Sequence, residues 1–304
     1  MAYSTTNKRE FNIDNIMTTQ PSAPPSYEAS QPINPDIMLE KQAKLQALCA
    51  RHDINPVFQS SLWSLNEKHI IFLCDDSGSM NSTVDNKYMS SAVGGVITRW
   101  DELKHVVAEV LDISLLFDPV GMDVHFLNRS SMLNVRTLAP LMHAFSNPPS
   151  GGTPLVAKLK SISQIYHNTA QYKFSKLLII ATDGQPTDDD SIFTGFKQII
   201  RELVEQGFNI AFLICTDRED QVKYINYVDR LYQQVDVTDD YLTEKRQVQK
   251  AQGRHFKFSY GDYIVKLLAG CIDPVLDGLD ERRLPIRATG GHTRHGPLGG
   301  CQIL

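Results

Sequence analysis

Five oxygen-bearing side chains in three separate loops are the residues of this sequence best suited to chemistry. Asp75, Ser77 and Ser79 share the stretch DDSGSM, Thr153 belongs to GGTP, and Asp183 belongs to TDG. Two carboxylates and three hydroxyls are hard oxygen ligands, which suit Mg²⁺, Mn²⁺ or Ca²⁺ and suit Zn²⁺ poorly. We therefore predict a divalent-cation site, with Mg²⁺ as the expected ion.

Two other interpretations of the same residues remain open. A run of Asp, Ser and Gly is also typical of an ordinary turn, although Thr153 and Asp183 favour a site. A metal-dependent hydrolase is the second alternative, because paired Asp75 and Asp76 are similar to the start of an aspartyl-phosphate phosphatase site. That chemistry wants an acid where Ser77 stands, and the sequence lacks G-x-S-x-G at this serine and H-E-x-x-H anywhere. No catalytic set is visible, so we predict a protein that is not an enzyme.

Alternating strand and helix patterns supply the loops that carry these side chains. Continuous apolar runs predict four strands, at residues 69–75, 122–127, 177–181 and 209–215. Helical periodicity predicts five helices, at residues 98–117, from about 154, 192–206, 221–232 and 262–276. Thr98 is the expected N-cap of the first of these helices, with Asp101 completing a capping box.

This alternation indicates an α/β fold with a doubly wound, mostly parallel sheet and helices on both faces, similar to a Rossmann fold. In such sheets, ligands bind beyond the carboxyl ends of the strands. The first predicted strand delivers Asp75 to that edge and the strand at 177–181 delivers Asp183. The fold is therefore expected to bring the two carboxylates together.

The three motifs D-x-S-x-S, G-G-T and T-D-G, in this order, resemble the metal-ion-dependent adhesion site of von Willebrand factor A (vWA) domains. The resemblance implies that Ser77, Ser79 and Thr153 hold the ion through hydroxyls, while Asp75 and Asp183 act largely through water. It also implies that a carboxylate of a partner protein completes the coordination. The absence of a disulfide pattern is similar to the intracellular members of the family.

Acidic residues beside this predicted site favour an acidic rim. Asp76 fills the variable position of D-x-S-x-S, and residues 188–190 are three consecutive aspartates after the last motif. Like charges repel, so we expect such a rim to disfavour acidic partners unless metal is bound.

Two short peptide motifs overlap in the N-terminal tail. The stretch PSAP is similar to the peptide bound by a subunit of the first endosomal sorting complex, and PPSY is similar to the P-P-x-Y peptide bound by WW domains of ubiquitin ligases. Proline preorganises a polyproline II segment and tyrosine offers a rigid anchor. The residues concerned are Pro21, Ser22, Ala23, Pro24, Pro25 and Tyr27.

The last four residues, CQIL, resemble a prenylation box with the lipid on Cys301, and the final leucine favours a geranylgeranyl group. Such a modification requires a eukaryotic host or a virus of one. A single lipid anchors only reversibly, so a second element is expected. Four arginines supply positive charge for an anionic surface: Arg282, Arg283, Arg287 and Arg294.

Composition excludes several classes of protein. The net charge of −5 and pI near 6.0 argue against a nucleic-acid binder. The longest apolar runs are strand-sized, and the N-terminus has no signal-peptide core. Five cysteines without an even, compact spacing indicate a reducing compartment. We therefore predict a cytoplasmic protein, peripheral to a membrane through the C-terminal lipid.

The predicted organisation has four parts. Residues 1–35 are a disordered tail, 36–66 a helical extension, 67–280 the vWA-like domain, and 281–304 a flexible basic tail. The expected function is a metal-dependent protein-binding module that acts as a membrane-tethered adaptor for WW-domain ubiquitin ligases or endosomal sorting proteins. A soluble signalling or chaperone-type binding protein with incidental tails is the alternative from another class, beside the hydrolase.

Overall fold

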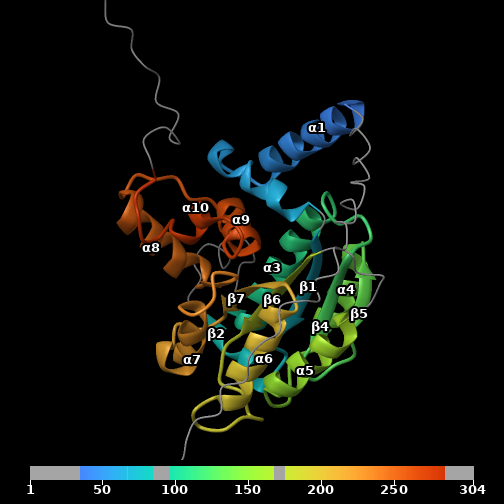
Figure 1. The fold of residues 1–304 in the computed structure, drawn as a ribbon, viewed down its shortest axis with the longest axis vertical. Coiled ribbons are helices and arrows are strands. Elements are labelled where there is room, and N and C mark those ends of the chain that lie inside the picture. The colour runs from blue at the N-terminus through green and yellow to red at the C-terminus, as the bar shows by residue number, and fades with distance from the viewer. Residues whose placement is uncertain (1–34, 67, 85–95, 168–174, 285–304) are drawn as a thin grey trace, which may run out of the picture. The chain divides into compact units, whose positions relative to one another are not determined.

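The computed structural model describes residues 35–66, 68–84, 96–167 and 175–284 (Figure 1). The chain divides into two compact units, residues 1–39 and 40–304, and helix α1 (Pro35–Arg51) begins in the first of them. The fold described below belongs to the second unit. The peptide motifs at residues 21–27, Arg287, Arg294 and the predicted lipidation site Cys301 lie outside the described residues.

A six-stranded sheet forms the centre of the second unit, in the order β5-β4-β1-β6-β7-β8. All neighbouring strands are parallel except β4 and the edge strand β5. The strands are β1 (Lys68–Cys74), β4 (Met122–Phe126), β5 (Met132–Val135), β6 (Ser175–Thr182), β7 (Phe208–Ile214) and β8 (Val235–Thr238). The predicted α/β class with a mostly parallel sheet is confirmed.

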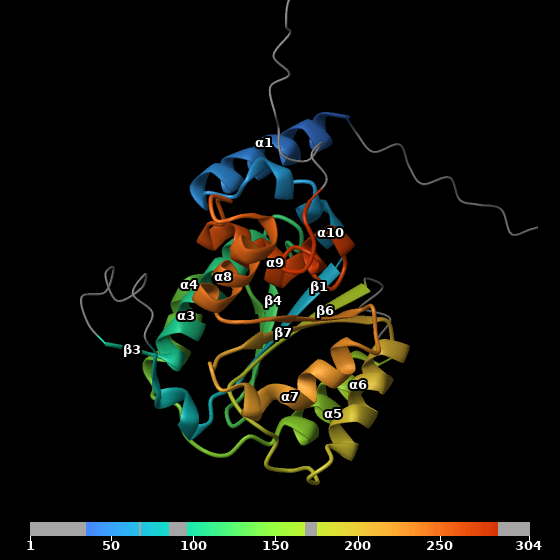
Figure 2. The ribbon, with the colours of Figure 1, turned by 90° about the vertical axis from the view of Figure 1, so that its left-hand side faces the viewer.

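Alternate residues of each central strand enter two hydrophobic clusters, one on each face of the sheet. On β1, Ile70 and Phe72 belong to one cluster, and Ile71 and Leu73 belong to the other. The first cluster includes α3 (Arg99–Ser114), α4 (Leu138–Ser146), α8 (Tyr241–Gln252) and α9 (Tyr260–Ala269). The second includes α5 (Leu155–Tyr166), α6 (Thr194–Glu205) and α7 (Glu219–Asp229), which lie across the sheet from α3 (Figure 2).

The segment before the first strand belongs to the same core as the sheet. Leu45, Leu48 and Cys49 of α1 are buried in the first hydrophobic cluster. The short 3-10 helices η1 (Pro56–Phe58) and η2 (Ser61–Leu65) add further apolar side chains to that cluster. This part of the chain therefore completes the core beside α9.

Local sequence signals explain where several elements begin and end. The predicted capping box is present at the start of α3, where the Thr98 hydroxyl accepts from the Asp101 N–H and the Asp101 carboxylate accepts from the Thr98 N–H. The single helix predicted at 262–276 is wrong. The chain forms α9 and then α10 (Pro274–Asp277), because Pro274 lacks an N–H and fits only the first turn, which Asp273 caps.

Four elements were not predicted from the sequence: β5, α4, β8 and α8. A two-stranded antiparallel ladder, β2 (Thr83–Val84) with β3 (Ile97–Thr98), precedes α3 and was also not predicted. Among the helices of the described segments, none has both the length and the apolar character that crossing a bilayer requires.

Candidate metal centre

Asp75 and Asp183 lie close together because the two central strands end side by side. β1 pairs with β6 in parallel, with Cys74 opposite Ala181, and the Asp75 N–H donates to the Ala181 carbonyl at 3.0 Å. The residues that follow each strand therefore enter loops at the same carboxyl edge. Both aspartates are buried, with 0% and 3% of their surface exposed.

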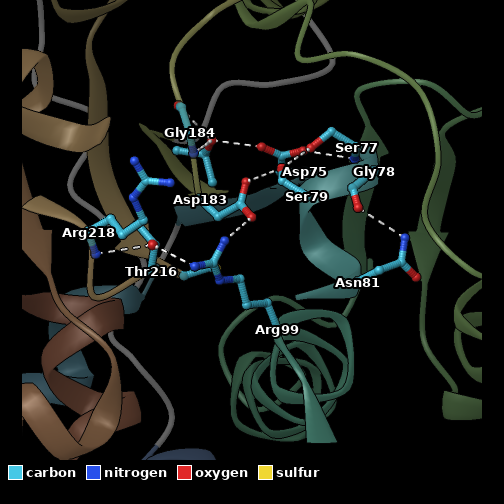
Figure 3. Close-up of polar contacts among 12 residues, drawn as sticks. Asp75, Ser77, Gly78, Ser79, Asn81, Arg99, Asp183, Gly184, Thr216 and Arg218 are labelled. Atoms are coloured by element: carbon cyan, nitrogen blue, oxygen red, sulfur yellow. Dashed lines mark hydrogen bonds and ion pairs between the residues drawn. The ribbon is translucent and has the colours of Figure 1, made fainter. Parts of the chain in front are cut away.

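A chain of hydrogen bonds joins four of the five predicted ligands (Figure 3). The hydroxyls of Ser77 and Ser79 lie 3.0 Å apart, and the Ser79 hydroxyl donates to Asp183 Oδ1 at 2.7 Å. Asp75 Oδ1 accepts from the Ser77 N–H at 2.9 Å, and its Oδ2 accepts from the Thr182 hydroxyl at 2.8 Å. The short 3-10 helix η3 (Gly78–Asn81) turns both serines towards the aspartates.

Thr153, the fifth predicted ligand, lies in the adjoining loop. The Gly78 N–H donates to the Gly151 carbonyl at 3.1 Å, which ties this loop to the first one. Thr153 and Thr187 exchange two hydrogen bonds, of 3.1 and 2.9 Å, so the third loop is tied in as well. Within the described chain, the Thr153 hydroxyl forms no hydrogen bond with the other four side chains. The structure thus joins four ligands directly and holds the fifth beside them.

Only glycine fits at residue 151, in the loop that precedes Thr153. Gly151 has a φ of +106°, and a Cβ there would lie 2.6 Å from Asn128 Oδ1. The Asn128 amide also donates to the Gly152 carbonyl at 2.9 Å. The close approach of Asn128 therefore explains why the loop before Thr153 carries glycine.

The electrostatics of the site favour a cation. Burial, helped by the charge of Asp183, raises the pKa of the Asp75 carboxyl to about 6 against the hydrogen bonds from Ser77 and Thr182. A raised pKa means that the surroundings disfavour the ionised carboxylate, and a nearby positive charge stabilises that form. The carboxylates therefore gain from a bound divalent ion.

The set of donor atoms fits a hard ion. Among the residues that the structure describes, no three Asp, Glu, His or Cys side chains gather closely enough to hold a metal. The predicted site needs no such group, because it combines two carboxylates with three neutral hydroxyls. Oxygen-only sites of low charge suit Mg²⁺, which usually keeps several waters.

Arg99 is the residue of this site that the sequence analysis missed. Its Nη1 donates to Asp183 Oδ2 at 2.7 Å, and its Nη2 donates to the Thr216 hydroxyl at 2.8 Å (Figure 3). The sequence placed Arg99 at the start of a helix after the N-cap Thr98. It gave no sign that the first turn of α3 faces the end of β6, because pairing between distant charges depends on the tertiary fold. Arg99 therefore supplies a protein-borne positive charge to Asp183.

The expected acidic rim is wrong at Asp76. This side chain is fully buried, at 0% exposure, and points away from solvent. Its Oδ1 accepts from the Asn128 N–H at 2.8 Å, and its Oδ2 lies 3.0 Å from Arg129 Nε. Asp76 thus ties the first loop to the loop after β4 rather than offering charge to a partner.

The three aspartates at 188–190 hold helix starts. Asp188 accepts from the N–H groups of Val156 and Ala157 in the first turn of α5, at 3.2 and 2.7 Å. Asp189 accepts at 2.9 and 2.8 Å from the first turn of α6, and Asp190 accepts from Thr194 N–H at 2.9 Å. Carboxylates stabilise helix N-termini in this way, while Asp188 and Asp190 stay exposed and present negative charge to solvent.

Comparison with known proteins does not add an identity. No protein-family model matches the chain, and no curated protein matches it in sequence. The resemblance to vWA domains therefore rests on the motifs quoted above together with the observed sheet and the geometry at its carboxyl edge.

Proposed function

We propose that this chain is a metal-dependent protein-binding module of the vWA type. One observation carries the proposal: Ser77, Ser79 and Asp183 form a continuous hydrogen-bonded chain beside the buried Asp75, at the shared end of β1 and β6. A bound Mg²⁺ would supply a positive charge to which a carboxylate of the partner protein coordinates. Mn²⁺ and Ca²⁺ have compatible ligand preferences.

The five predicted ligands have two different roles in such a site. Asp75 and Asp183 provide the negative charge, while Ser77, Ser79 and Thr153 provide neutral oxygens. The two carboxylates balance the formal charge of a divalent ion. Because Arg99 already pairs with one of these acids, the occupied site has an excess positive charge that attracts a further carboxylate.

A hollow beside the site supports a protein as the ligand. It has a volume of about 490 Å³ and is lined by residues of both charges, including Arg99, Glu102, Asp217, Lys245 and Arg246. A mixed lining of this kind suits the side chains that flank an acidic residue in a partner protein. We place the partner's neighbouring residues in this hollow.

The motifs predicted in the two tails add a second part to the proposal, the recruitment of other proteins to a membrane. A WW-domain ubiquitin ligase would bind Pro24, Pro25 and Tyr27, and an endosomal sorting subunit would bind the stretch from Pro21 to Pro24. A prenyl group on Cys301 would hold the protein at the cytoplasmic face of a membrane. The module is then an adaptor that connects a membrane-bound partner to these machineries.

A pull-down from cell lysate with the full-length protein, in Mg²⁺ and again in EDTA, tests the metal-dependent binding. We expect partners that are captured in Mg²⁺ and lost in EDTA, and lost again with Thr153→Ala in Mg²⁺. The same capture in all three conditions would contradict the proposal. Membrane fractionation of Cys301→Ser separates a tethered adaptor from a soluble binding protein, and turnover of phosphate esters would instead support the hydrolase.

A further inference from the structure

Two neighbouring helices expose a group of basic and apolar side chains that the core does not explain. We define the α6–α7 face by six residues: Lys197, Arg201, Lys223, Tyr227, Arg230 and Leu231. Tyr227 and Leu231 are 51% and 55% exposed, although large apolar side chains are usually buried. Helices α6 and α7 run side by side on the surface of the unit in both views (Figure 1, Figure 2).

The two exposed apolar residues form a ridge between shallow hollows. One hollow, of about 360 Å³, lies between α6 and α7, and the other, of about 490 Å³, follows α7. Both are lined by Tyr227 and Leu231, which lie four residues apart and so project on the same side of the chain. A partner helix binds in an apolar groove, whereas a protruding apolar ridge is suited to insertion into a lipid surface.

The charge of this face has one sign. The lining of the two hollows contains four basic side chains and no aspartate or glutamate, whereas the whole chain has a net charge of −5. Lys197 Nζ lies 4.7 Å above the Tyr227 ring, so charge and apolar surface are interleaved. Arg201 lies 3.9 Å from Glu205, but both side chains are highly exposed, so Glu205 is a weak partner.

The α6–α7 face also lies beside the point where the folded domain leads into the C-terminal tail. A third hollow, of about 650 Å³, joins Arg230 and Leu231 to Arg282, and its lining also contains the acids Asp229, Asp277 and Glu281. The chain continues after Leu284 from this place. The described domain therefore ends on the same side as the C-terminal end of α7.

We propose that the α6–α7 face lies against the surface of an anionic membrane. Tyr227 and Leu231 would enter the boundary between headgroups and acyl chains, where tyrosine is favoured. The four cations would contact lipid phosphates, each strengthening binding about fivefold. The proposal deepens the membrane part of the proposed function, and it adds a face of the folded domain to the tail arginines that are expected to support the lipid anchor.

Vesicle sedimentation with full-length protein from bacteria, which carries no prenyl group, tests this face without the lipid, and the charge-reversed variants separate it from the tail arginines. We expect binding to vesicles of phosphatidylserine and phosphatidylcholine, little binding to phosphatidylcholine alone, and loss of binding in high salt. Lys223→Glu with Arg230→Glu should weaken binding at least twentyfold, since two favourable charges are reversed. Tyr227→Ser with Leu231→Ser should weaken it severalfold and leave the salt dependence unchanged.

A matched charge reversal elsewhere separates a specific face from general electrostatics. Lys250→Glu with Arg254→Glu changes the net charge equally at exposed residues of another surface, and we expect it to leave binding nearly unchanged. Equal binding to both vesicle types, or equal loss in both reversed pairs, would overturn the proposal and favour an acidic protein as the occupant. Because no prenyl group is present, this outcome is independent of whether Cys301→Ser releases the protein from cell membranes.

Discussion

The two ends of the central sheet each bury a group of carboxylates, but they compensate the charge differently. At the amino ends of β1 and β4, His69 lies between two acids, with Nδ1 at 2.8 Å from Asp118 and Nε2 at 2.9 Å from Asp123. The Tyr166 hydroxyl donates to Asp123 at 2.6 Å. At the carboxyl ends, Asp75 receives only hydrogen bonds from neutral groups.

The pKa values of the two groups express this difference. Burial alone would lower the pKa of His69, but the hydrogen bonds and charges of Asp118 and Asp123 outweigh it and raise the pKa to about 9. Burial raises the pKa of Asp123, but hydrogen bonds from His69, Tyr166 and the Asn134 N–H, together with the charge of His69, hold it below its usual value. Asp75, by contrast, has its pKa raised to about 6. The amino-end cluster contains a cation that contacts both of its acids. At the carboxyl end Arg99 pairs with Asp183 alone, so the charge of Asp75 is left to be completed by a ligand.

The comparison predicts that the amino-end cluster matters most for stability. His69→Leu leaves Asp118 and Asp123 buried without a cation, and we expect the free energy of unfolding to fall by about 3–5 kcal/mol. Urea denaturation near neutral pH measures this loss. His143→Leu, at an exposed histidine, should change stability little. A loss below about 1 kcal/mol in His69→Leu would show that the cluster does not hold the fold.

The pH dependence of stability gives the next largest effect. Because the pKa of His69 is about 9 when folded and about 6.5 when unfolded, its stabilisation is complete below pH 6.5 and disappears as the pH rises through 9. The titratable groups that contact the His69 ring are Asp118, Asp123 and Tyr166. We expect wild type to lose on the order of 3 kcal/mol over this range, and His69→Leu to lack this component. Parallel pH profiles of the two proteins would contradict the assignment.

At the carboxyl end, the corresponding substitution should affect binding instead of folding. Asp75→Ala removes a buried carboxylate that has no cationic partner, so we expect unchanged or slightly raised thermal stability and at least about a hundredfold loss of Mg²⁺ affinity, or about 2.7 kcal/mol. Calorimetry with Mg²⁺ and Mn²⁺ measures the affinity. Asp217→Ala removes an exposed acid beside Arg99 and should bind metal normally. Equal affinity in all three proteins would argue against the site.

The smallest predicted effect concerns Arg99. Replacement by glutamine removes a positive charge beside Asp183, and we expect Mg²⁺ to bind roughly tenfold more tightly because repulsion between the cations is lost. Arg218→Gln, at an exposed arginine on the loop that Arg99 reaches, is the matched control. Weaker binding in Arg99→Gln would mean that the guanidinium positions Asp183 rather than competing with the ion.

The central strands were predictable because their signal is local and strong. The run from Ile70 to Cys74 is apolar without interruption, and Thr98 with Asp101 fixes the start of α3 within a few residues. The carboxyl-edge location of Asp75 and Asp183 followed from the general geometry of parallel sheets. These parts needed no knowledge of distant contacts.

The remaining parts depend on tertiary contacts or on weak patterns. β8, with the sequence VDVT, is short and carries a buried acid, and α8 is too polar to show a clear apolar stripe. Asp76 and Arg129 are 53 positions apart in the sequence and meet only because β1 and β4 are neighbours. The acidic rim was inferred from composition, which does not reveal that a carboxylate is used to hold another loop.

The cross-links among the three site loops have a consequence for the speed of recognition. Gly78 with Gly151, Thr153 with Thr187, and Asp188 with the start of α5 hold these loops to one another through backbone groups. Loops fixed in this way lose little conformational entropy on binding, and a partner need not wait for them to rearrange. Differences in affinity among partners should then appear mainly as differences in residence time, while their association rates stay similar.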